Sequence, residues 1–377
     1  MWQTSERVTR LKSSPIRDIL QAIDRPGMIS FAGGLPSEDS FPRISIPQLD
    51  HHQLQYGATE GELELRELIA ADLCKRGLNV VAKQIIITSG SQQGIDLVAK
   101  LVVDQGTQVA VESPTYLAAL QVFSLFGAHY QTYTANSLQQ LRNKHNIALT
   151  YVVPTFQNPT GHCYSSKQRK ALAEACDAIG CLLFEDDPYR DICYDDCDRR
   201  PVSADIRNTS WVYQSSFSKT FAPGLRLGYI ACSEDLFAQL SLLKQAADLH
   251  SNRLSQYLTT QQLKDSERLN REKMLIKSYR RKRDNFNNVL NHYFSDVADW
   301  HVPAGGLFFW LKFRSNIDSQ KLLEESLSKN VAFMPGDPFY CDVSAVEPTI
   351  RLNFSHATEE QAKVGLTMLA GILKRVI

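Results

Sequence analysis

The chain has 377 residues, more than one small core requires, so we expect one large and one smaller domain. Hydrophobic residues make up 43% and charged residues 22%, which is ordinary for a globular protein. The 41 basic side chains balance the 41 acidic ones, so the chain lacks the basic excess typical of nucleic-acid-binding domains. The N-terminus has no signal-peptide pattern, and no apolar run approaches the roughly 20 residues that span a bilayer. We therefore expect a cytoplasmic protein that binds neither nucleic acid nor membrane.

The eight cysteines are scattered along the chain and, without a signal peptide, are expected to be reduced thiols. Cys193 and Cys197 lie in an acidic stretch, where a metal site is the alternative interpretation. Their spacing matches no zinc pattern with a second half nearby. We therefore interpret the stretch as a solvated acidic loop and expect no metal.

Short apolar runs alternate with helical patterns through the middle of the chain, which is typical of a sheet with crossover helices. The pattern predicts helices at Glu62–Arg76, Gln93–Val103, Tyr116–Phe126 and Lys167–Ile179. It predicts strands at Gln84–Thr88, Gln108–Glu112, Leu149–Pro154, Cys181–Glu185, Trp211–Ser215 and Gly228–Cys232.

The pattern changes near residue 266, where a long charged helix is predicted at Glu267–Tyr293. Mixed segments follow at Trp300–Phe313 and Val331–Phe354, and a last helix is predicted at Glu359–Val376. This part is typical of a second, α+β domain. We expect a large domain at 46–270, a small domain at 271–377, and an N-terminal segment, 1–45, that packs with the small domain.

Unusual polar groups follow several of the predicted strands, and ligands of such sheets collect at the C-terminal strand ends. Thr88–Gly94 follows a strand and opens a helix, whose free N–H groups suit an anion. A phosphate cradle and an ordinary helix cap are the two interpretations. Gln157–Gly161 includes Asn-Pro-Thr-Gly, which is also a good turn sequence by itself.

Three carboxylates, Glu185, Asp186 and Asp187, end another apolar strand, and Tyr189 follows them. Carboxylates are costly to bury unless they are paired with a cation or a protonated base. The pattern favours a ligand-binding role, and a solvated loop is the alternative for one or two of them.

Lys219 also follows a strand, lies among small hydroxyl side chains and has Arg226 seven residues later. A lone lysine is usually a surface cation. An amine held where its charge is disfavoured can instead act as a nucleophile or form an imine.

Ser216-x-x-Lys219 with Arg226 and Gly228 resembles the lysine signature of fold-type I pyridoxal-phosphate enzymes, the aspartate aminotransferase superfamily. The other strand-end motifs occur in the family's order, so the resemblance covers nearly the whole chain. Within that superfamily the sequence is similar to the kynurenine/2-aminoadipate aminotransferase group, through Phe31–Pro36, Leu54–Gly57, Ser89–Gln93 and Gln157–Gly161. The resemblance implies an α/β fold, in which a large domain with a mostly parallel seven-stranded sheet is joined to a smaller α+β domain. It also implies a homodimer with shared active sites.

The resemblance assigns the catalytic roles to Lys219, Asp186 and Tyr189. Lys219 would form a Schiff base with pyridoxal 5′-phosphate and later move a proton between the substrate Cα and C4′. Asp186 would keep the pyridine nitrogen protonated. Asp187 is the competing candidate, and the three-residue spacing to Tyr189 favours Asp186. Tyr189 and Asn158 match the residues that bond the ring O3′.

The remaining cofactor contacts are implied in the same way. The phosphate ligands would be Ser91, Gln92, Ser216, Ser218 and Arg226, and a guanidinium suits phosphate because it can donate two parallel bonds. Tyr116 matches the aromatic residue that stacks on the ring, with a core tyrosine as the alternative. Tyr56 matches a tyrosine that reaches the phosphate of the neighbouring subunit.

Substrate contacts are implied at Arg351 and Gly34, where Arg351 would bind the α-carboxylate and Asn158 would lie beside it. A surface arginine on a strand is the alternative for Arg351. Arg17 matches an arginine that can meet a distal carboxylate in the 2-aminoadipate members, and a helix cap facing solvent is the alternative. We assign a structural role to the run Pro303–Trp310.

These features predict an aminotransferase that moves the amino group of an L-amino acid (2-aminoadipate-like, aromatic or aliphatic) to a 2-oxo acid. A ping-pong mechanism with 2-oxoglutarate is expected from the group. A lyase, decarboxylase or racemase on the same scaffold is one alternative, and a non-catalytic cofactor-binding sensor is another. Arg351 argues against the sensor, because a pure sensor need not keep a substrate clamp. Many relatives carry an N-terminal DNA-binding domain, which we expect this chain to lack.

Overall fold

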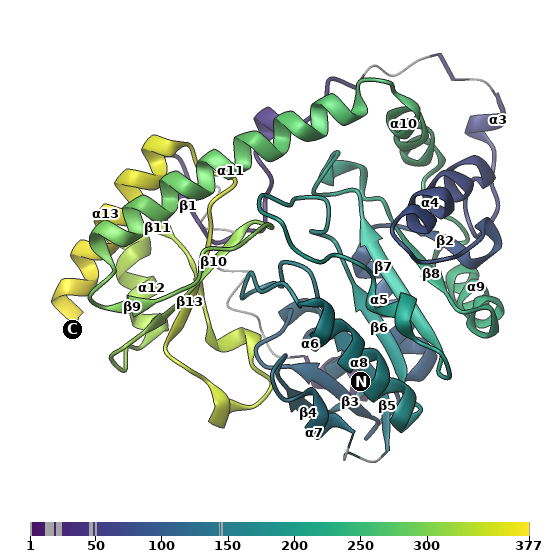
Figure 1. The fold of residues 1–377 in the computed structure, drawn as a ribbon, viewed down its shortest axis with the longest axis horizontal. Helices are drawn as coiled ribbons and strands as arrows, with labels where there is room; N and C mark the ends of the chain where they lie inside the picture. The colour runs from purple at the N-terminus through teal and green to yellow at the C-terminus, as the bar shows by residue number, and fades with distance from the viewer. Residues whose placement is uncertain are drawn as a thin grey trace.

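A seven-stranded sheet forms the centre of the computed structural model, which describes residues 2–11, 19, 25–44, 48–49, 51–142, 144 and 146–376 (Figure 1). Its strands are β2 (Ile85–Thr88), β3 (Gln108–Glu112), β4 (His129–Tyr133), β5 (Ile147–Val152), β6 (Leu182–Asp186), β7 (Trp211–Ser216) and β8 (Gly228–Cys232). The order is β2-β8-β7-β6-β5-β3-β4, and β8 alone runs antiparallel to its neighbours in this sheet. The predicted mostly parallel sheet is confirmed.

The edge strand β4 was not predicted, because its sequence, His-Tyr-Gln-Thr-Tyr, carries neither an apolar run nor a clear alternation. Only Tyr133 of this strand is buried. Pairing with β3 therefore decides its conformation, and such a contact leaves no local pattern in the sequence.

Helices cover both faces of the sheet, as Figure 1 shows. They are α4 (Leu63–Lys75), α5 (Ser91–Val102), α6 (Leu117–Phe126), α7 (Leu138–Leu141), α8 (Ser166–Ile179), α9 (Glu234–Asp248) and α10 (Arg253–Lys264). Residues of α5, α6 and α9 form one core with one face of the strands, whereas α4 and α8 pack on the other. The strand residues alternate between these cores, as the period of two requires. Two short helices, α1 (Glu6–Thr9) and α3 (His51–Leu54), lie outside this arrangement.

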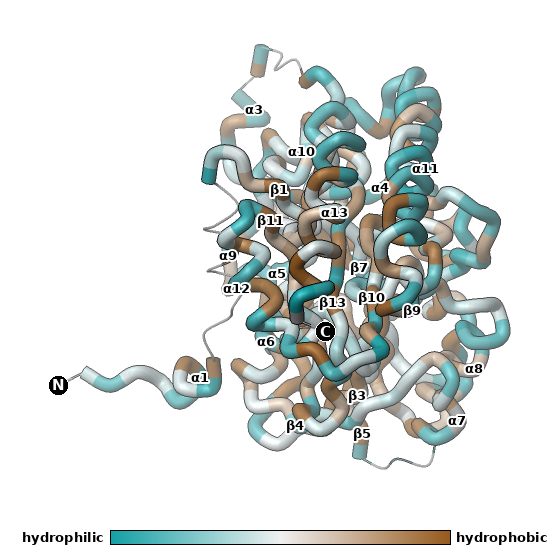
Figure 2. Tube along the Cα trace, turned by 90° about the vertical axis from the view of Figure 1, so that its left-hand side faces the viewer, coloured by the Kyte–Doolittle hydropathy of each residue, from teal (hydrophilic) through white to brown (hydrophobic). Residues whose placement is uncertain are grey.

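The second part of the chain builds a smaller antiparallel sheet in the order β12-β13-β10-β9. Its elements are α11 (Arg268–Tyr293), β9 (Ala298–Asp299), β10 (Phe308–Phe313), α12 (Ser319–Ser328), β11 (Val331–Ala332), β12 (Met334–Pro335), β13 (Thr349–Asn353) and α13 (Glu359–Val376). The long helix α11 runs from α10 to the second sheet and packs along α13 (Figure 1). Figure 2 shows apolar segments inside this part and polar turns on the outer side of α11.

An N-terminal strand joins this second part. β1 (Ile29–Ser30) pairs in parallel with β11, and the Phe31 N–H donates to the Ala332 carbonyl. The Phe31 ring is fully buried and meets Phe286 of α11 edge-on. Residues 29–31 are thus held by partners about 300 positions later in the chain.

The acidic stretch at Cys193 and Cys197 is not simply a solvated loop, as we had interpreted it. Asp195 forms ion pairs with Arg280 and Arg283 of α11, and Cys193 forms a backbone bridge with Gly305. The stretch therefore connects the loop after β6 with the second part of the chain. Among the described residues, none of the helices is long and apolar enough to cross a membrane.

Gly305 provides a test of this connection. A Cβ at Gly305 would lie 2.3 Å from the Phe156 ring and 2.4 Å from the Ile192 carbonyl oxygen, and overpacking of this kind typically costs about 1–3 kcal/mol. Gly305→Ala should therefore lower the melting temperature. Gly371→Ala on α13 is the matched control, because its Cβ meets no atom within 4 Å and alanine favours helix. Equal melting temperatures for the two variants would contradict the packing described.

Candidate active site

A cavity opens where β2, β5, β6 and β7 end. It is lined by ten predicted cofactor residues: Ser91, Gln92, Tyr116, Asn158, Asp186, Tyr189, Ser216, Ser218, Lys219 and Arg226. Leu35, Val153, Pro188 and Pro223, which were not predicted, also line it. Residues more than 180 positions apart along the chain thus meet in one cavity.

The Lys219 amine lies between the large sheet and the N-terminal segment. Its Nζ donates a hydrogen bond to the Gly34 carbonyl oxygen at 2.8 Å and lies 5.9 Å from the centre of the Tyr189 ring. Burial, together with the positive charges of Arg351 and Arg226, lowers the pKa of Lys219 to about 8. A substantial fraction of this amine is therefore neutral and nucleophilic near neutral pH.

Asp186 faces the cavity, whereas its neighbour Asp187 does not line it. The Tyr151 hydroxyl donates to Asp186 Oδ2 at 2.8 Å, and the buried Oδ1 has no hydrogen-bond partner in the described structure. Asp187 instead accepts a hydrogen bond from Tyr213 at 3.1 Å and lies 3.7 Å from Arg190. Burial raises the pKa of Asp186 to about 6, against the lowering effects of the nearby Gln214 side chain and of the Tyr151 hydrogen bond. Each of the two carboxylates has one buried oxygen without a hydrogen-bond partner, but only that of Asp186 belongs to a residue that lines the cavity, where it could meet a protonated ring nitrogen.

The loop between β2 and α5 forms an anion cradle. Gly90 precedes α5 with a φ of 78°, and a Cβ there would lie 2.7 Å from Arg226 Nη2. A Cβ at Gly228 would lie 3.0 Å from the Ser91 backbone nitrogen. The two glycines therefore bring the helix N-terminus and the Arg226 guanidinium together. Both groups favour a phosphate.

Arg351, on β13, is a buried cation without a counter-charge. Its Nη1 donates to Asn158 Oδ1 at 2.7 Å and its Nη2 to the Ala32 carbonyl at 2.5 Å, while Nε has no partner in the described structure. The guanidinium lies over the Phe308 ring at 4.3 Å and near the Phe339 ring at 5.1 Å. Burial lowers its pKa to about 10. None of the described carboxylates forms an ion pair with it, so a carboxylate ligand would relieve the cost of its burial.

Three predicted and described site residues, Gly34, Arg351 and Tyr56, are not among the residues that line this cavity. Gly34 and Arg351 contact it, because Lys219 donates to the Gly34 carbonyl and Arg351 donates to Asn158. Tyr56 is 76% exposed, and its ring meets His250 edge-on with a centroid separation of 5.8 Å. Arg17 and the phrase around it lie outside the described residues.

Sequence reasoning missed three aromatic residues around the site. Tyr151 holds Asp186, and its signal was a polar hydroxyl within an apolar strand, which needs a partner when buried. Phe308 and Phe339 flank Arg351. They lie in apolar segments whose role only tertiary packing reveals, and Phe308 belongs to the run to which we had assigned structural work.

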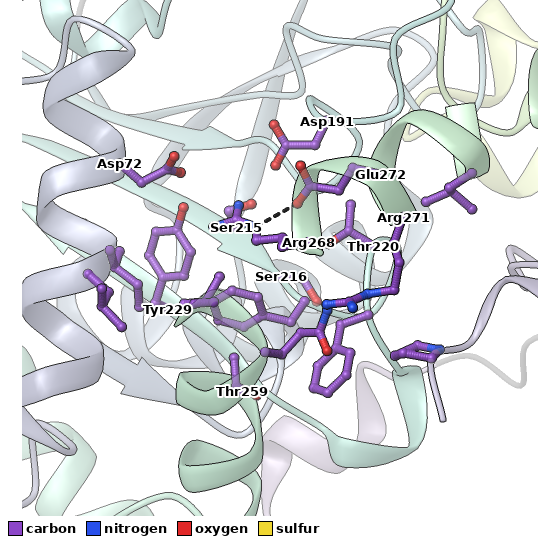
Figure 3. Close-up of a pocket in the computed structure, with 18 of the residues that line it drawn as sticks. Asp72, Asp191, Ser215, Ser216, Thr220, Tyr229, Thr259, Arg268, Arg271 and Glu272 are labelled. Carbon is purple, nitrogen blue, oxygen red and sulfur yellow. Dashed lines mark hydrogen bonds and ion pairs between the residues drawn. The ribbon is translucent and has the colours of Figure 1, made fainter. Parts of the chain in front are cut away.

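A second cavity lies on the other side of the Ser215–Phe221 segment, between α4, α10 and α11 (Figure 3). Several of its charged side chains are paired with one another. Arg268 binds Glu272 at 2.6 Å, and Arg76 lies 2.5 Å from Asp72 and 3.1 Å from Asp191. These pairs offset the charges of the five side chains that form them.

Comparison with known proteins decides the family. Residues 40–369 match the model of aminotransferase class I and II. The chain belongs to the class I and II aminotransferases. It is 32% identical to aromatic-amino-acid aminotransferase 1 of Thermococcus litoralis, over 98% of this chain and 94% of that protein.

Two solved structures extend the likeness to the whole fold. A kynurenine aminotransferase of Pyrococcus horikoshii, in complex with PMP, superposes with a TM-score of 0.91 at 31% identity and covers 99% of this chain and 97% of that one. The α-aminoadipate aminotransferase LysN of Thermus thermophilus, complexed with N-(5′-phosphopyridoxyl)-L-leucine, gives a TM-score of 0.89 at 30% identity with the same coverage. The predicted fold type I, the pyridoxal-phosphate cofactor and the aminotransferase activity are confirmed.

The lowered pKa of Lys219 predicts a pH dependence. Only the neutral amine attacks the cofactor aldehyde, so its covalent capture by the apoenzyme should accelerate about tenfold per pH unit below pH 8 and level off above it. Stopped-flow absorbance between pH 6 and 10 measures this rate. Free Nα-acetyl-lysine, with its ordinary pKa, should keep accelerating to about pH 10 and serves as the reference. A rate profile parallel to that reference would show that Lys219 is not perturbed.

Proposed function

We propose that Lys219, Asp186 and Tyr189 are the catalytic residues of this aminotransferase and that the cavity holds pyridoxal 5′-phosphate. The observation that carries the proposal is that a perturbed amine and a buried carboxylate with a free oxygen line one cavity, and that the unpaired Arg351 guanidinium donates a hydrogen bond to Asn158, which lines the same cavity. When bound, this cofactor supplies an aldehyde that condenses with amines and a ring that accepts an electron pair.

Lys219 would hold the cofactor covalently through its amine. Once freed by the substrate amine, the Lys219 amine would carry the proton of the substrate Cα, a task that suits a base with a pKa near the working pH. The Gly34 carbonyl, at 2.8 Å from Nζ, orients the amine.

Asp186 and Tyr189 would bond two different atoms of the cofactor ring, the nitrogen and O3′. The free Oδ1 of Asp186 would pair with the protonated ring nitrogen, as a buried carboxylate requires. Burial raises the pKa of the Tyr189 phenol above its ordinary value, so the phenol stays protonated and can donate to O3′, beside Asn158. Tyr116 would cover the ring, and Ser91, Gln92, Ser216, Ser218 and Arg226 would bind the phosphate.

Arg351 would bind the substrate α-carboxylate, with Asn158 and Gly34 beside it. A Cβ at Gly34 would lie 3.3 Å from Phe308 and 3.9 Å from Lys219 Nζ. A side chain there would therefore fill the space between the amine and the aromatic platform of Arg351. Because glycine has no side chain, the space between Lys219 and Phe308 stays open for an amino-acid substrate.

We propose that the donor is a 2-aminoadipate-like, aromatic or aliphatic L-amino acid and that 2-oxoglutarate is the acceptor in a ping-pong cycle. The names of the similar enzymes, which act on aromatic amino acids, kynurenine and aminoadipate, support this range. We further propose a cytoplasmic homodimer in which the exposed Tyr56 reaches the partner's phosphate. The 76% exposure of a tyrosine otherwise in contact with His250 supports that role.

A half-reaction tests the function. The yellow enzyme, mixed with one amino acid at a time, should lose its long-wavelength absorbance and gain that of pyridoxamine phosphate, and 2-oxoglutarate should restore the first spectrum. Lys219→Ala should show neither change at a comparable rate, because the proton carrier is missing. Ammonia and pyruvate released without pyridoxamine phosphate would instead indicate a lyase.

Arg17 tests the substrate class. If its guanidinium binds a distal carboxylate, Arg17→Ala should lower kcat/KM for 2-aminoadipate about tenfold or more and spare leucine, because a charge-assisted hydrogen bond is typically worth about 1.5–3 kcal/mol. The ratio of the two kcat/KM values is the measurement. A ratio equal to that of the wild type would rule out this role for Arg17.

A further inference from the structure

Tyr151 is held rigidly in the middle of β5. Its side chain is fully buried and lies between the rings of Phe123 and Phe184, with centroid separations of 5.6 and 5.5 Å. The Tyr133 hydroxyl donates to the Tyr151 carbonyl oxygen at 2.9 Å and fixes the backbone as well. The ring therefore has little freedom to reorient.

The hydroxyl of this ring has one hydrogen, and that hydrogen is donated to Asp186 Oδ2 at 2.8 Å. Burial and the neighbouring Asp186 charge raise the pKa of the Tyr151 phenol well above its ordinary value, so it stays a donor at every working pH. Oδ2 is thereby occupied. Oδ1, on the same carboxylate, is buried without a protein partner.

We propose that Tyr151 is a positioning residue that turns Asp186 Oδ1 toward the cofactor nitrogen and favours the carboxylate over the carboxylic acid. The proposal rests on the proposed role of Asp186. The phenol donates a hydrogen bond to the Asp186 carboxylate and so stabilises the anion beside the effect of Gln214. The proton shared between Asp186 and the ring nitrogen would therefore reside on the nitrogen. Without this hydrogen bond, the proton would move toward Asp186, and the ring would become a weaker electron acceptor.

A packing role alone does not explain the hydroxyl. Phe123 and Phe184, the rings in contact with Tyr151, show that this region of the core accepts phenylalanine. Burying a hydroxyl costs free energy unless it is hydrogen-bonded, and Asp186 is the partner here. Burial already brings the pKa of Asp186 to about 6, so the loss of one donor would carry it into the working range.

The test uses Tyr151→Phe, which removes the hydroxyl and keeps the ring. Tyr130→Phe is the matched control, because it removes a hydrogen-bonded phenol hydroxyl from the same sheet, one that donates to the Leu120 carbonyl at 2.7 Å and not to Asp186. The dissociation constant of pyridoxal phosphate is measured by titrating each apoenzyme, and the acidic limb of kcat against pH is recorded. Tyr151→Phe should weaken cofactor binding about tenfold and move the limb to higher pH, and Tyr130→Phe should do neither.

Site-specific 3-fluorotyrosine at position 151 gives a second readout if the phenylalanine variant fails to fold. Its phenol is a stronger donor, so the acidic limb should move to lower pH. An unshifted limb and unchanged cofactor affinity in Tyr151→Phe, or an unshifted limb with 3-fluorotyrosine, would overturn the proposal, as would an equal effect of Tyr130→Phe. Asp186→Asn separates the two levels. If Asp186→Asn also keeps the wild-type cofactor affinity and acidic limb, the proposed role of Asp186 is wrong. If Asp186→Asn changes them and Tyr151→Phe does not, only the proposed role of Tyr151 is wrong.

Discussion

The burial of three consecutive carboxylates at the end of β6 is the constraint on which the site depends. Successive strand residues face opposite sides of the sheet, so Glu185 and Asp187 point away from the side that Asp186 faces. Each of the outer two has protein partners: Glu185 accepts hydrogen bonds from Ser203, and Asp187 from Tyr213. Asp186 and Asp187 each keep one buried oxygen without a hydrogen-bond partner, and of the two only Asp186 lines the cavity. The free oxygen of Asp186 is left for a ligand with a proton to donate.

Positive groups balance this carboxylate from the other side of the cavity. Three cations lie on different elements: Lys219 follows β7, Arg226 precedes β8 and Arg351 is on β13. Burial works against their charge, as the lowered pKa values of Lys219 and Arg351 show. A phosphate and an amino-acid carboxylate would offset that cost. Burial of the cations, which costs free energy in the protein alone, would therefore be compensated once cofactor and substrate bind.

The N-terminal segment connects the two ends of the site. Pairing of β1 with β11 places the Ala32 carbonyl on Arg351 and the Gly34 carbonyl on Lys219. One short segment therefore contacts both the Lys219 amine and the Arg351 guanidinium, to which we assign cofactor and substrate binding in the proposed function. The contact of Asp195 with Arg283 of α11 connects the loop after the carboxylates with the second part of the chain.

The sequence by itself determined the elements whose periodicity is strong and the residues whose chemistry follows a strand. The helix Glu359–Val376 and the strands Gln108–Glu112 and Gly228–Cys232 have the predicted bounds. Lys219 and Asp186 were identified because a polar group at the end of an apolar strand is unusual and because the motifs resemble a family. The two helices α9 and α10 were not predicted.

Only the tertiary structure decided which groups pair. Asp186 lines the cavity and Asp187 does not, because successive residues point to opposite faces of the sheet. The sequence spacing favoured Asp186 but could not decide between the two. The Tyr151 hydrogen bond and the rings around Arg351 join residues that are 35 or more positions apart. No local pattern encodes such contacts, because they arise when neighbouring strands and distant segments pack together. The sequence thus determined the reactive groups, and packing decided their ionisation and partners.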